Sequence, residues 1–369
     1  MKYIIKRMMQ LLLAILILLV IGTLLYMQHD RFGGTATGNR LAKMQGMPNF
    51  KDGVFENLEH TPAITEGTPY SKLLASLFFG KDARLRPDKP LPVVQTDLRK
   101  LPVDSNLYLW FGHSSYLLQI DGKKIVVDPV FSTYASPVRY AVRAFDMTYE
   151  YKAADLPDID ILVITHDHWD HLDYNTFMEI KDRVKHIVTG LGVGAHLEKW
   201  GYPADQITEL YWDESAEVDG LKFTAAPGRH FSGRTFKRNT TLWSAFILQS
   251  TQQKIFIGGD SGYGTHFKTI GEKYGPFDYA ILENGQYDAM WKYIHMQPEE
   301  VLTAAQDLKA HYTVPVHSSK FPLANHPWDE PLIRISKAAQ VQDMPLVTPK
   351  IGQVVSLHHY QKFGEWWKE

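Results

Sequence analysis

An apolar segment of about twenty residues stands near the start of the chain. Between Met8 and Met27 only Gln10, Gly22 and Thr23 interrupt a run of apolar side chains, and a helix needs about 20 such residues to cross a bilayer. The run ends without the small-residue cleavage site that a secretory signal peptide carries. The pattern therefore predicts an uncleaved signal anchor that forms a single transmembrane helix.

Basic residues on the amino-terminal side of this segment predict its orientation. Lys2, Lys6 and Arg7 precede the apolar run, and flanks rich in Lys and Arg stay on the cytoplasmic side of a membrane. We expect a single-pass membrane protein with its N-terminus in the cytoplasm. The rest of the chain is then expected in a periplasmic or other extracytoplasmic compartment.

Beyond the anchor the pattern changes twice. Residues 28–103 are rich in Gly and Pro and contain one short helical pattern, from Tyr70 to Phe79. Alternating apolar positions then predict the first strands of a sheet, at Leu107–Phe111, His113–Ile120 and Lys124–Val127. We therefore predict a membrane anchor over residues 1–30, a membrane-proximal extension over residues 31–103 and one main domain over residues 104–369.

Strands and helices alternate in this main domain. The apolar run Ile159–Thr165 predicts a buried strand, and Asp173–Lys185 predicts a helix with Asp173 as its N-cap and apolar residues at helical spacing. Further strands are predicted at Leu221–Ala226, Lys254–Ile257 and Tyr312–Val316. This order is typical of a layered α/β domain, in which loops at strand ends bring functional side chains together.

Each of these four strands is followed by histidine or aspartate. In chain order the strands lead into His166-Asp167-His168-Trp169-Asp170-His171, His230, Asp260 and His317. Imidazole nitrogens and carboxylate oxygens are good ligands for zinc, and Mn²⁺ or Fe²⁺ also accept them. Because residues i and i+2 of an extended segment project the same way, we expect the first two histidines to bind one ion and Asp170 and His171 to face a second.

The later strand ends supply the remaining donors of this predicted centre. His230 and His317 are natural nitrogen ligands, and Asp260 is a carboxylate that can bridge two cations and hold them ~3.5 to 4 Å apart. The chain contains no cysteine, so a thiolate zinc site, an iron–sulfur cluster and a disulfide framework are excluded. The sequence therefore predicts two metal ions held by nitrogen and oxygen.

Charge balance excludes another class of partner. The 369 residues include 39 basic and 41 acidic side chains, for a net charge of −2, whereas proteins that bind nucleic acid present a strongly basic face. We therefore expect no nucleic-acid partner. The segment from Gly190 to Ala195, with Asp213 further on, imitates a dinucleotide fingerprint, but its flanking strands already lead into the predicted metal loops, so we do not expect a dinucleotide cofactor.

The segment from Thr165 to Asp173 resembles the signature of the metallo-β-lactamase-fold hydrolases. This resemblance implies an α/β fold, a four-layer αβ/βα sandwich with a two-metal site at one edge of its sheets, here preceded by one transmembrane helix. It also implies one zinc on His166, His168 and His230, a second on Asp170, His171 and His317, and a bridging Asp260.

Further stretches are similar to one branch of that fold, the N-acyl-phosphatidylethanolamine-hydrolysing phospholipases D. They are Trp110-Phe111-Gly112-His113-Ser114-Ser115, Asp128-Pro129-Val130-Phe131, Gly259-Asp260-Ser261-Gly262-Tyr263 and His295-Met296-Gln297-Pro298-Glu299-Glu300. The implied protein is a membrane-anchored dinuclear zinc phosphodiesterase. It would use a metal-bound hydroxide to hydrolyse N-acyl-phosphatidylethanolamine, or a related phospholipid, to N-acylethanolamine and phosphatidic acid. The resemblance also suggests a homodimer, and the partners it implies are the phospholipid substrate and the membrane.

Three residues, Asp260, His295 and Asp128, carry further expectations. Asp260 and His295 are the predicted catalytic residues, His295 either as a proton donor or phosphate-binding group or as a structural histidine. Asp128 either orients a metal-binding histidine or caps a turn. Two alternative functions stay open: a two-metal hydrolase of another ester, such as a lactone or sugar phosphate, and a non-catalytic metal-binding membrane protein.

Overall fold

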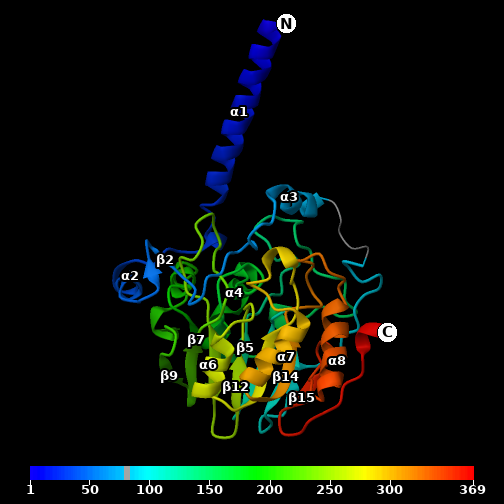
Figure 1. Cartoon of the computed structure of the whole chain (residues 1–369). Helices are drawn as coiled ribbons and strands as arrows, with labels where there is room; N and C mark the ends of the chain where they lie inside the picture. Colours follow the sequence, from blue (N-terminus) through cyan, green and yellow to red (C-terminus); the bar gives the residue numbers. More distant parts are fainter. Residues whose placement is uncertain (79–83) are drawn as a thin grey trace.

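The computed structural model describes residues 1–78 and 84–369 (Figure 1). Its helices are α1 (Lys2–Tyr26), α2 (Gly38–Gln45), α3 (Tyr70–Phe78), α4 (Tyr174–Ile180), α5 (Gly194–Lys199), α6 (His266–Lys273), α7 (Pro298–Asp307) and α8 (Glu330–Gln342). Its strands are β1 (Phe50–Lys51), β2 (Val54–Phe55), β3 (Leu107–Trp110), β4 (Tyr116–Ile120), β5 (Lys123–Val127), β6 (Ile159–Ile164), β7 (Val184–Gly190), β8 (Ile207–Leu210), β9 (Ser215–Val218), β10 (Leu221–Ala226), β11 (Ala245–Gln249), β12 (Lys254–Ile257), β13 (Phe277–Glu283), β14 (Ala310–Val316) and β15 (Val354–Ser356).

Two sheets form the centre of the main domain. One has the strand order β15-β3-β4-β5-β6-β7-β8 and the other β14-β13-β12-β11-β10-β9. Apolar side chains from both sheets make one buried cluster between them, for example Leu118 and Ile161 from the first and Phe223 and Ile255 from the second. Because each strand alternates its side chains between two faces, the opposite faces also need cover.

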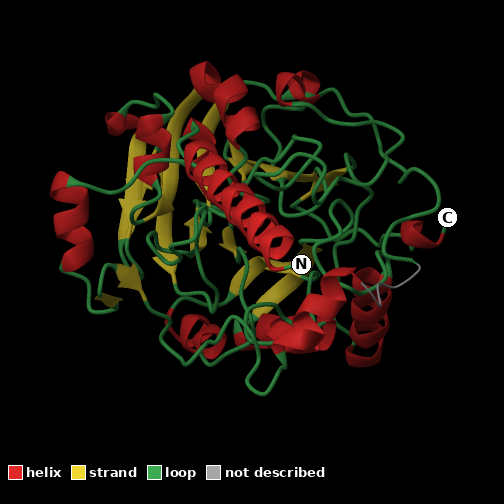
Figure 2. Ribbon diagram, turned by 90° about the horizontal axis from the view of Figure 1, so that it is seen from above, coloured by secondary structure: helices red, strands yellow, loops and turns green. Residues whose placement is uncertain are grey.

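Helices supply that cover on both sides. Phe177 of α4 and Leu197 of α5 pack against the outer face of the seven-stranded sheet. Phe267 of α6, Val301 of α7 and Ile335 of α8 pack against the six-stranded sheet. Seen from the end where α1 leaves, helices lie outside the strands (Figure 2). The predicted four-layer αβ/βα sandwich is therefore confirmed.

Parallel pairing gathers the functional loops at one edge. Strands β5, β6 and β7 are parallel in one sheet, and β12, β13 and β14 are parallel in the other. The carboxyl ends of parallel strands meet at the same edge of a sheet, where ligands are usually bound. The loops after β6, β12 and β14 therefore leave from neighbouring positions, and they carry the predicted ligands.

Two predicted elements differ from the structure. The predicted helix Asp173–Lys185 ends earlier, since α4 stops at Ile180 and Val184 begins strand β7, which pairs with β6 along its length. The predicted strand His113–Ile120 begins only at Tyr116, because His113 adopts a left-handed backbone conformation with φ of 53°. The helix is shorter than its local pattern predicts because Val184 pairs in the sheet. The strand is shorter because the chain turns at His113.

The amino-terminal part combines a free helix with a packed segment. Helix α1 has no buried residue and is long and apolar enough to cross a membrane. Met44 of α2 and Phe55 of β2 are buried against Leu191 and Trp243 of the main domain. The short helix predicted at Tyr70 appears as α3, while Phe79 lies outside the described residues. The domain boundary at residue 103 stays a prediction.

Candidate metal centre

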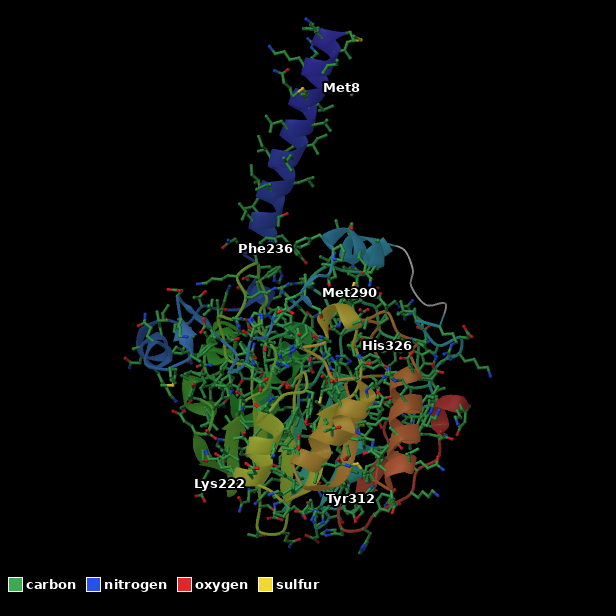
Figure 3. All side chains as sticks on the ribbon, in the orientation of Figure 1. Met8, Lys222, Phe236, Met290, Tyr312 and His326 are labelled. Carbon is green, nitrogen blue, oxygen red and sulfur yellow. The ribbon has the colours of Figure 1, made fainter. Side chains whose placement is uncertain are left out.

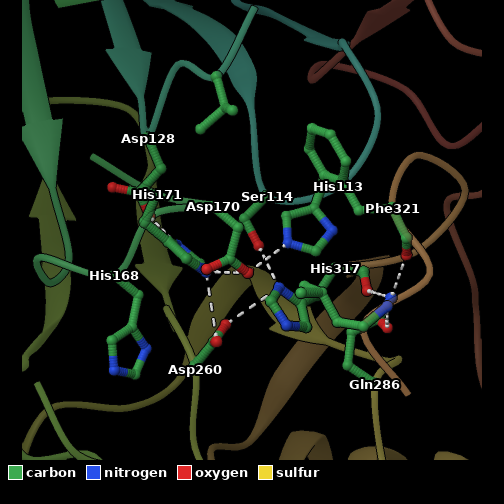
Figure 4. A network of polar contacts seen from close by, with 12 residues as sticks. His113, Ser114, Asp128, His168, Asp170, His171, Asp260, Gln286, His317 and Phe321 are labelled. Atoms are coloured by element: carbon green, nitrogen blue, oxygen red, sulfur yellow. Dashed lines mark hydrogen bonds and ion pairs between the residues drawn. The ribbon is translucent and has the colours of Figure 1, made fainter. Parts of the chain in front are cut away.

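All seven predicted ligands meet at the edge of the two sheets. Figure 4 labels five of them, His168, Asp170, His171, Asp260 and His317. The loop after β6 supplies four of the seven, and the loops after β10, β12 and β14 supply His230, Asp260 and His317. The close approach of two loops needs Gly259: it has φ of +60°, and a Cβ there would lie 2.9 Å from the Cβ of Thr165. Glycine alone accepts both conditions without strain.

The first cluster contains His166, His168, His230 and Asp260. The His166 Nε2 atom lies 2.9 Å from His168 Nδ1, and His230 Nε2 lies 3.2 Å from the same atom. His230 donates its Nδ1 proton to the carbonyl of Ile294 (2.9 Å), so its Nε2 carries a lone pair. Nitrogen atoms that point their lone pairs at one place favour a bound cation there.

The second cluster contains Asp170, His171 and His317, as predicted, together with His113. His113 donates from Nε2 to Asp170 Oδ2 (2.8 Å), and its ring lies 4.1 Å from the His317 ring. Sequence reasoning did not include His113 in the site. His113 follows Gly112 in a turn, and this was the one hint in the sequence. The residue that His113 contacts, Asp170, lies 57 positions further along the chain.

The distances between donor atoms in both clusters fit bound metal ions. Ligand atoms at about 2.0–2.1 Å from a tetrahedral zinc lie about 3.3 Å from each other. Asp260 Oδ2 lies 3.2 Å from His171 Nε2 and 3.7 Å from His230 Nε2, while Asp260 Oδ1 lies 3.2 Å from His317 Nδ1. Asp260 therefore contacts both clusters. Within the described residues, His171 Nε2 and Asp260 Oδ1 are buried without a well-formed hydrogen bond, which a bound cation would remedy.

Most protonation states in the site suit cation binding. His171 is the exception, because burial lowers its pKa but the charges of Asp260 and Asp170 outweigh burial and leave that pKa raised. Burial lowers the pKa of His166, His230 and His317 well below the usual value, so these rings are neutral. Burial also opposes ionisation of Asp260, but the positive charge of His171 beside it outweighs burial and holds the pKa of that carboxyl well below its usual range. Neutral imidazoles and ionised carboxylates are the forms that bind metal.

Asp128 connects the two clusters through hydrogen bonds. Its Oδ2 accepts the Nδ1 proton of His171 (2.8 Å) and the hydroxyl proton of Thr165 (2.6 Å). The Thr165 oxygen is 3.0 Å from His166 Nδ1 and accepts its proton. One carboxylate thus orients a histidine of each cluster, the first of the two roles predicted for it, and fixes the ring nitrogen that faces the site.

Replacing Asp128 by asparagine should weaken metal binding by about 10- to 100-fold, the usual effect of removing a group that orients metal ligands. The amide keeps the shape of the side chain but cannot accept from both His171 and Thr165 with the same strength. Metal affinity measured by competition with a chromophoric chelator checks this expectation. Asp104→Asn, in the exposed loop before β3, is the matched control, and an unchanged affinity in the Asp128 variant would contradict the orienting role.

His295 lies beside the clusters and is held by a buried glutamate. Its Nδ1 is 3.0 Å from Glu283 Oε2, and its ring stacks on His317 at 5.2 Å. Burial lowers the pKa of His295, but the charge of Glu283 outweighs it and leaves the pKa raised. Sequence reasoning missed Glu283, although a charged residue at the end of the apolar strand β13 was a usable signal.

One predicted ligand and one residue beside the ligands adopt uncommon backbone conformations. His113 and His317 have φ of 53° and 66°, a region that side chains with a Cβ rarely occupy. Their backbones bind each other, since the amide of His317 donates to the carbonyl of His113 (2.9 Å). Gln286 also holds this loop through the carbonyls of His317 and Phe321 (3.3 and 3.0 Å; Figure 4). Such strain persists where surrounding contacts enforce it.

Amides of the glycine-rich segment after β7 bind a carboxylate of the chain itself. Glu209 Oε1 accepts from the amides of Gly192 (2.7 Å) and Gly194 (3.0 Å). A carboxylate thus already occupies the amides that would bind a pyrophosphate. The absence of a dinucleotide cofactor stays a prediction.

Comparison with known proteins places these features in context. Residues 123–318 match the family model described as "Beta-lactamase superfamily domain". An uncharacterised protein of Mycobacterium tuberculosis is 37% identical over 341 residues, which cover 91% of this chain and 91% of the relative. N-acyl-phosphatidylethanolamine-hydrolyzing phospholipase D 1 of Caenorhabditis elegans is 30% identical over 293 residues, which cover 72% of this chain and 80% of the relative.

A solved structure shows the same fold. A metallo hydrolase of the archaeon Ignicoccus hospitalis superposes with a TM-score of 0.51 and is 22% identical in sequence. The match covers 70% of this chain and 100% of the archaeal one.

Proposed function

The chain belongs to the beta-lactamase superfamily and is a metal-dependent hydrolase, and on that premise we propose that it is a membrane-anchored dinuclear zinc phosphodiesterase of the phospholipase D type. The proposed substrate is N-acyl-phosphatidylethanolamine or a related phospholipid, and the products are N-acylethanolamine and phosphatidic acid. The nematode relative, whose printed name gives this activity, supports the substrate class.

One observation carries the proposal: two donor clusters share Asp260 at an edge that touches the end of the membrane helix. Phe32, six residues after α1, packs edge-on against Trp169 between the ligands His168 and Asp170, with ring centroids 5.3 Å apart. When bound, two divalent cations lower the pKa of water and neutralise the charge on phosphoryl oxygens. A site so close to a bilayer suits a substrate that resides in it.

The residues beside the clusters suit cleavage of a phosphodiester. Water adds to phosphorus, the bond from phosphorus to the ethanolamine oxygen breaks, and that oxygen needs a proton. Glu283 engages Nδ1 of His295, so Nε2 is the atom available to give this proton as a general acid. Asp260 keeps its position because both of its oxygens contact ligand histidines.

The membrane placement belongs to the same proposal. We take α1 as the span, with Lys2, Lys6 and Arg7 holding the N-terminus in the cytoplasm and the hydrolase domain on the extracytoplasmic side. Zinc is the proposed metal because nitrogen and oxygen donors at this spacing suit it, and Mn²⁺ or Fe²⁺ would use the same residues. A homodimer stays a prediction from the resemblance.

The full chain, reconstituted in nanodiscs with zinc and N-acyl-phosphatidylethanolamine, should release N-acylethanolamine and phosphatidic acid in equal amounts. Mass spectrometry in water enriched in ¹⁸O should find the label in phosphatidic acid alone, because the proposed reaction breaks the bond to phosphorus. Asp260→Asn should release neither product. Turnover of a lactone or sugar phosphate without lipid cleavage would support the alternative two-metal hydrolase and contradict the lipid substrate.

A further inference from the structure

The end of the membrane helix is fixed to a surface loop of the hydrolase domain. The hydroxyl of Tyr26 donates to the carbonyl of Pro137, and Arg31 Nη1 donates to the same carbonyl (3.4 Å). The aromatic contact between Phe32 and Trp169 follows directly. If α1 spans a bilayer, the loop around Pro137 therefore lies at the bilayer surface.

Three segments near this exit expose large apolar side chains, and we call them the rim: residues 70–76, 136–144 and 231–241. Tyr70 of α3 is 79% exposed, Tyr140 is 72% exposed and Phe236 is 82% exposed. Figure 3 places Phe236 at the foot of α1, and Figure 1 shows α3 at the same end of the molecule. Soluble surfaces rarely gather such side chains without a partner.

The charge of the rim has one sign. Its three segments contain no Asp or Glu and five exposed basic residues, namely Lys72, Arg139, Arg143, Lys237 and Arg238. The sixth basic residue, Arg234, is buried. The guanidinium of Arg139 lies 5.0 Å from the ring centre of Tyr140. Aromatic rings beside basic groups are typical of protein segments at a membrane interface, where rings enter the headgroup region and cations meet anionic lipid.

The opposite end of the domain has a different character. Figure 3 places Lys222 and Tyr312 there, far from α1. Around that end basic side chains pair with acidic ones, as Lys123 does with Asp219 (2.8 Å) and Lys185 with Asp160 (2.5 Å). These pairs balance charge locally. The rim has no acidic side chain of its own, although its Arg143 pairs with Asp146 just beyond it (2.9 Å).

We propose that the rim docks on the leaflet from which α1 emerges, with Tyr140 and Phe236 in the headgroup region and the exposed basic side chains on anionic phospholipid. This inference rests on the membrane span proposed above. Docking at several points holds the domain in one orientation, with the loop that carries His166 to His171 facing the lipid. The anchor alone would leave the domain free to rotate.

A cysteine-free chain makes this inference directly testable. Full-length single-cysteine variants Phe236→Cys and Tyr140→Cys, carrying an environment-sensitive fluorophore, are placed in nanodiscs that contain phosphatidylglycerol. Val341→Cys is the matched control, because Val341 is 81% exposed and apolar and precedes the segment that pairs with Thr313 at the far end. Leu13→Cys, within α1, reports whether the helix spans the bilayer.

Labels at positions 236 and 140 should be quenched by nitroxide lipids and should be at least about threefold less accessible to iodide than the label at 341, as expected for groups buried in the interface. Nanodiscs of neutral phosphatidylcholine should weaken this shielding. Equal iodide access at 236, 140 and 341, with position 13 shielded, would overturn the docking while leaving the span. Iodide access at position 13 would overturn both, and neither result depends on enzymatic activity.

Discussion

Replacing Asp260 by asparagine should abolish hydrolysis and empty part of the metal centre. The carboxylate contacts His171 and His230 through one oxygen and His317 through the other, so it belongs to both clusters. An amide offers a single neutral oxygen and loses the charge that balances two cations. Removing groups that only orient ligands already costs about 10- to 100-fold, so we expect a loss of more than about a hundredfold here.

Two measurements on the same preparation check this expectation. Turnover is followed with the lipid substrate, and metal content is measured by plasma emission spectrometry. Asp104→Asn provides the matched control, since it makes the same chemical change in an exposed loop. Wild-type turnover in the Asp260 variant would contradict the bridging role. Full metal content combined with lost turnover would instead assign Asp260 to the reaction alone.

Replacing Arg234 by methionine should lower the free energy of unfolding by about 3 kcal/mol or more. Its guanidinium is buried and donates to the carbonyls of Asp167 (2.9 Å), Leu172 (2.7 Å) and Arg31 (2.7 Å). It also lies 4.0 Å from the ring centre of Trp169. Each buried carbonyl left without a donor costs about 1–3 kcal/mol, and methionine supplies none.

Unfolding of the full chain in detergent, followed by tryptophan fluorescence, measures this effect. Arg238→Met is the control, because Arg238 is exposed in the same loop. Equal stability of the two variants would show that the three carbonyls find other donors. Because Asp167 and Leu172 flank the ligands His168, Asp170 and His171, we also expect the Arg234 variant to bind metal less tightly.

The seven residues predicted as ligands could be picked out from the sequence because their signal is local. Each ligand follows a strand end, and strands such as β10 and β12 have the predicted bounds. Parallel strands then bring their ends together without further information. Asp128 was also identifiable, since it directly follows the apolar strand β5, although two roles stayed open until its contacts with His171 and Thr165 were seen.

Residues whose role depends on distant partners were not predictable. His113, Glu283 and Arg234 act through Asp170, His295 and the carbonyl of Arg31, and the last contact joins residues 203 positions apart. No spacing rule within one sequence encodes such contacts. The early end of α4 has a similar cause, because pairing of β7 with β6 decides the structure of Val184.

Asp128 and Asp260 together couple the binding of metal ions in the two clusters. Asp260 contacts ligand histidines of both clusters, and Asp128 binds His171 directly and His166 through Thr165. Ordering of one cluster by an ion therefore also orders side chains of the other. Such coupling is reciprocal: the factor by which the first occupied site changes the affinity of the second is the same whichever of them fills first.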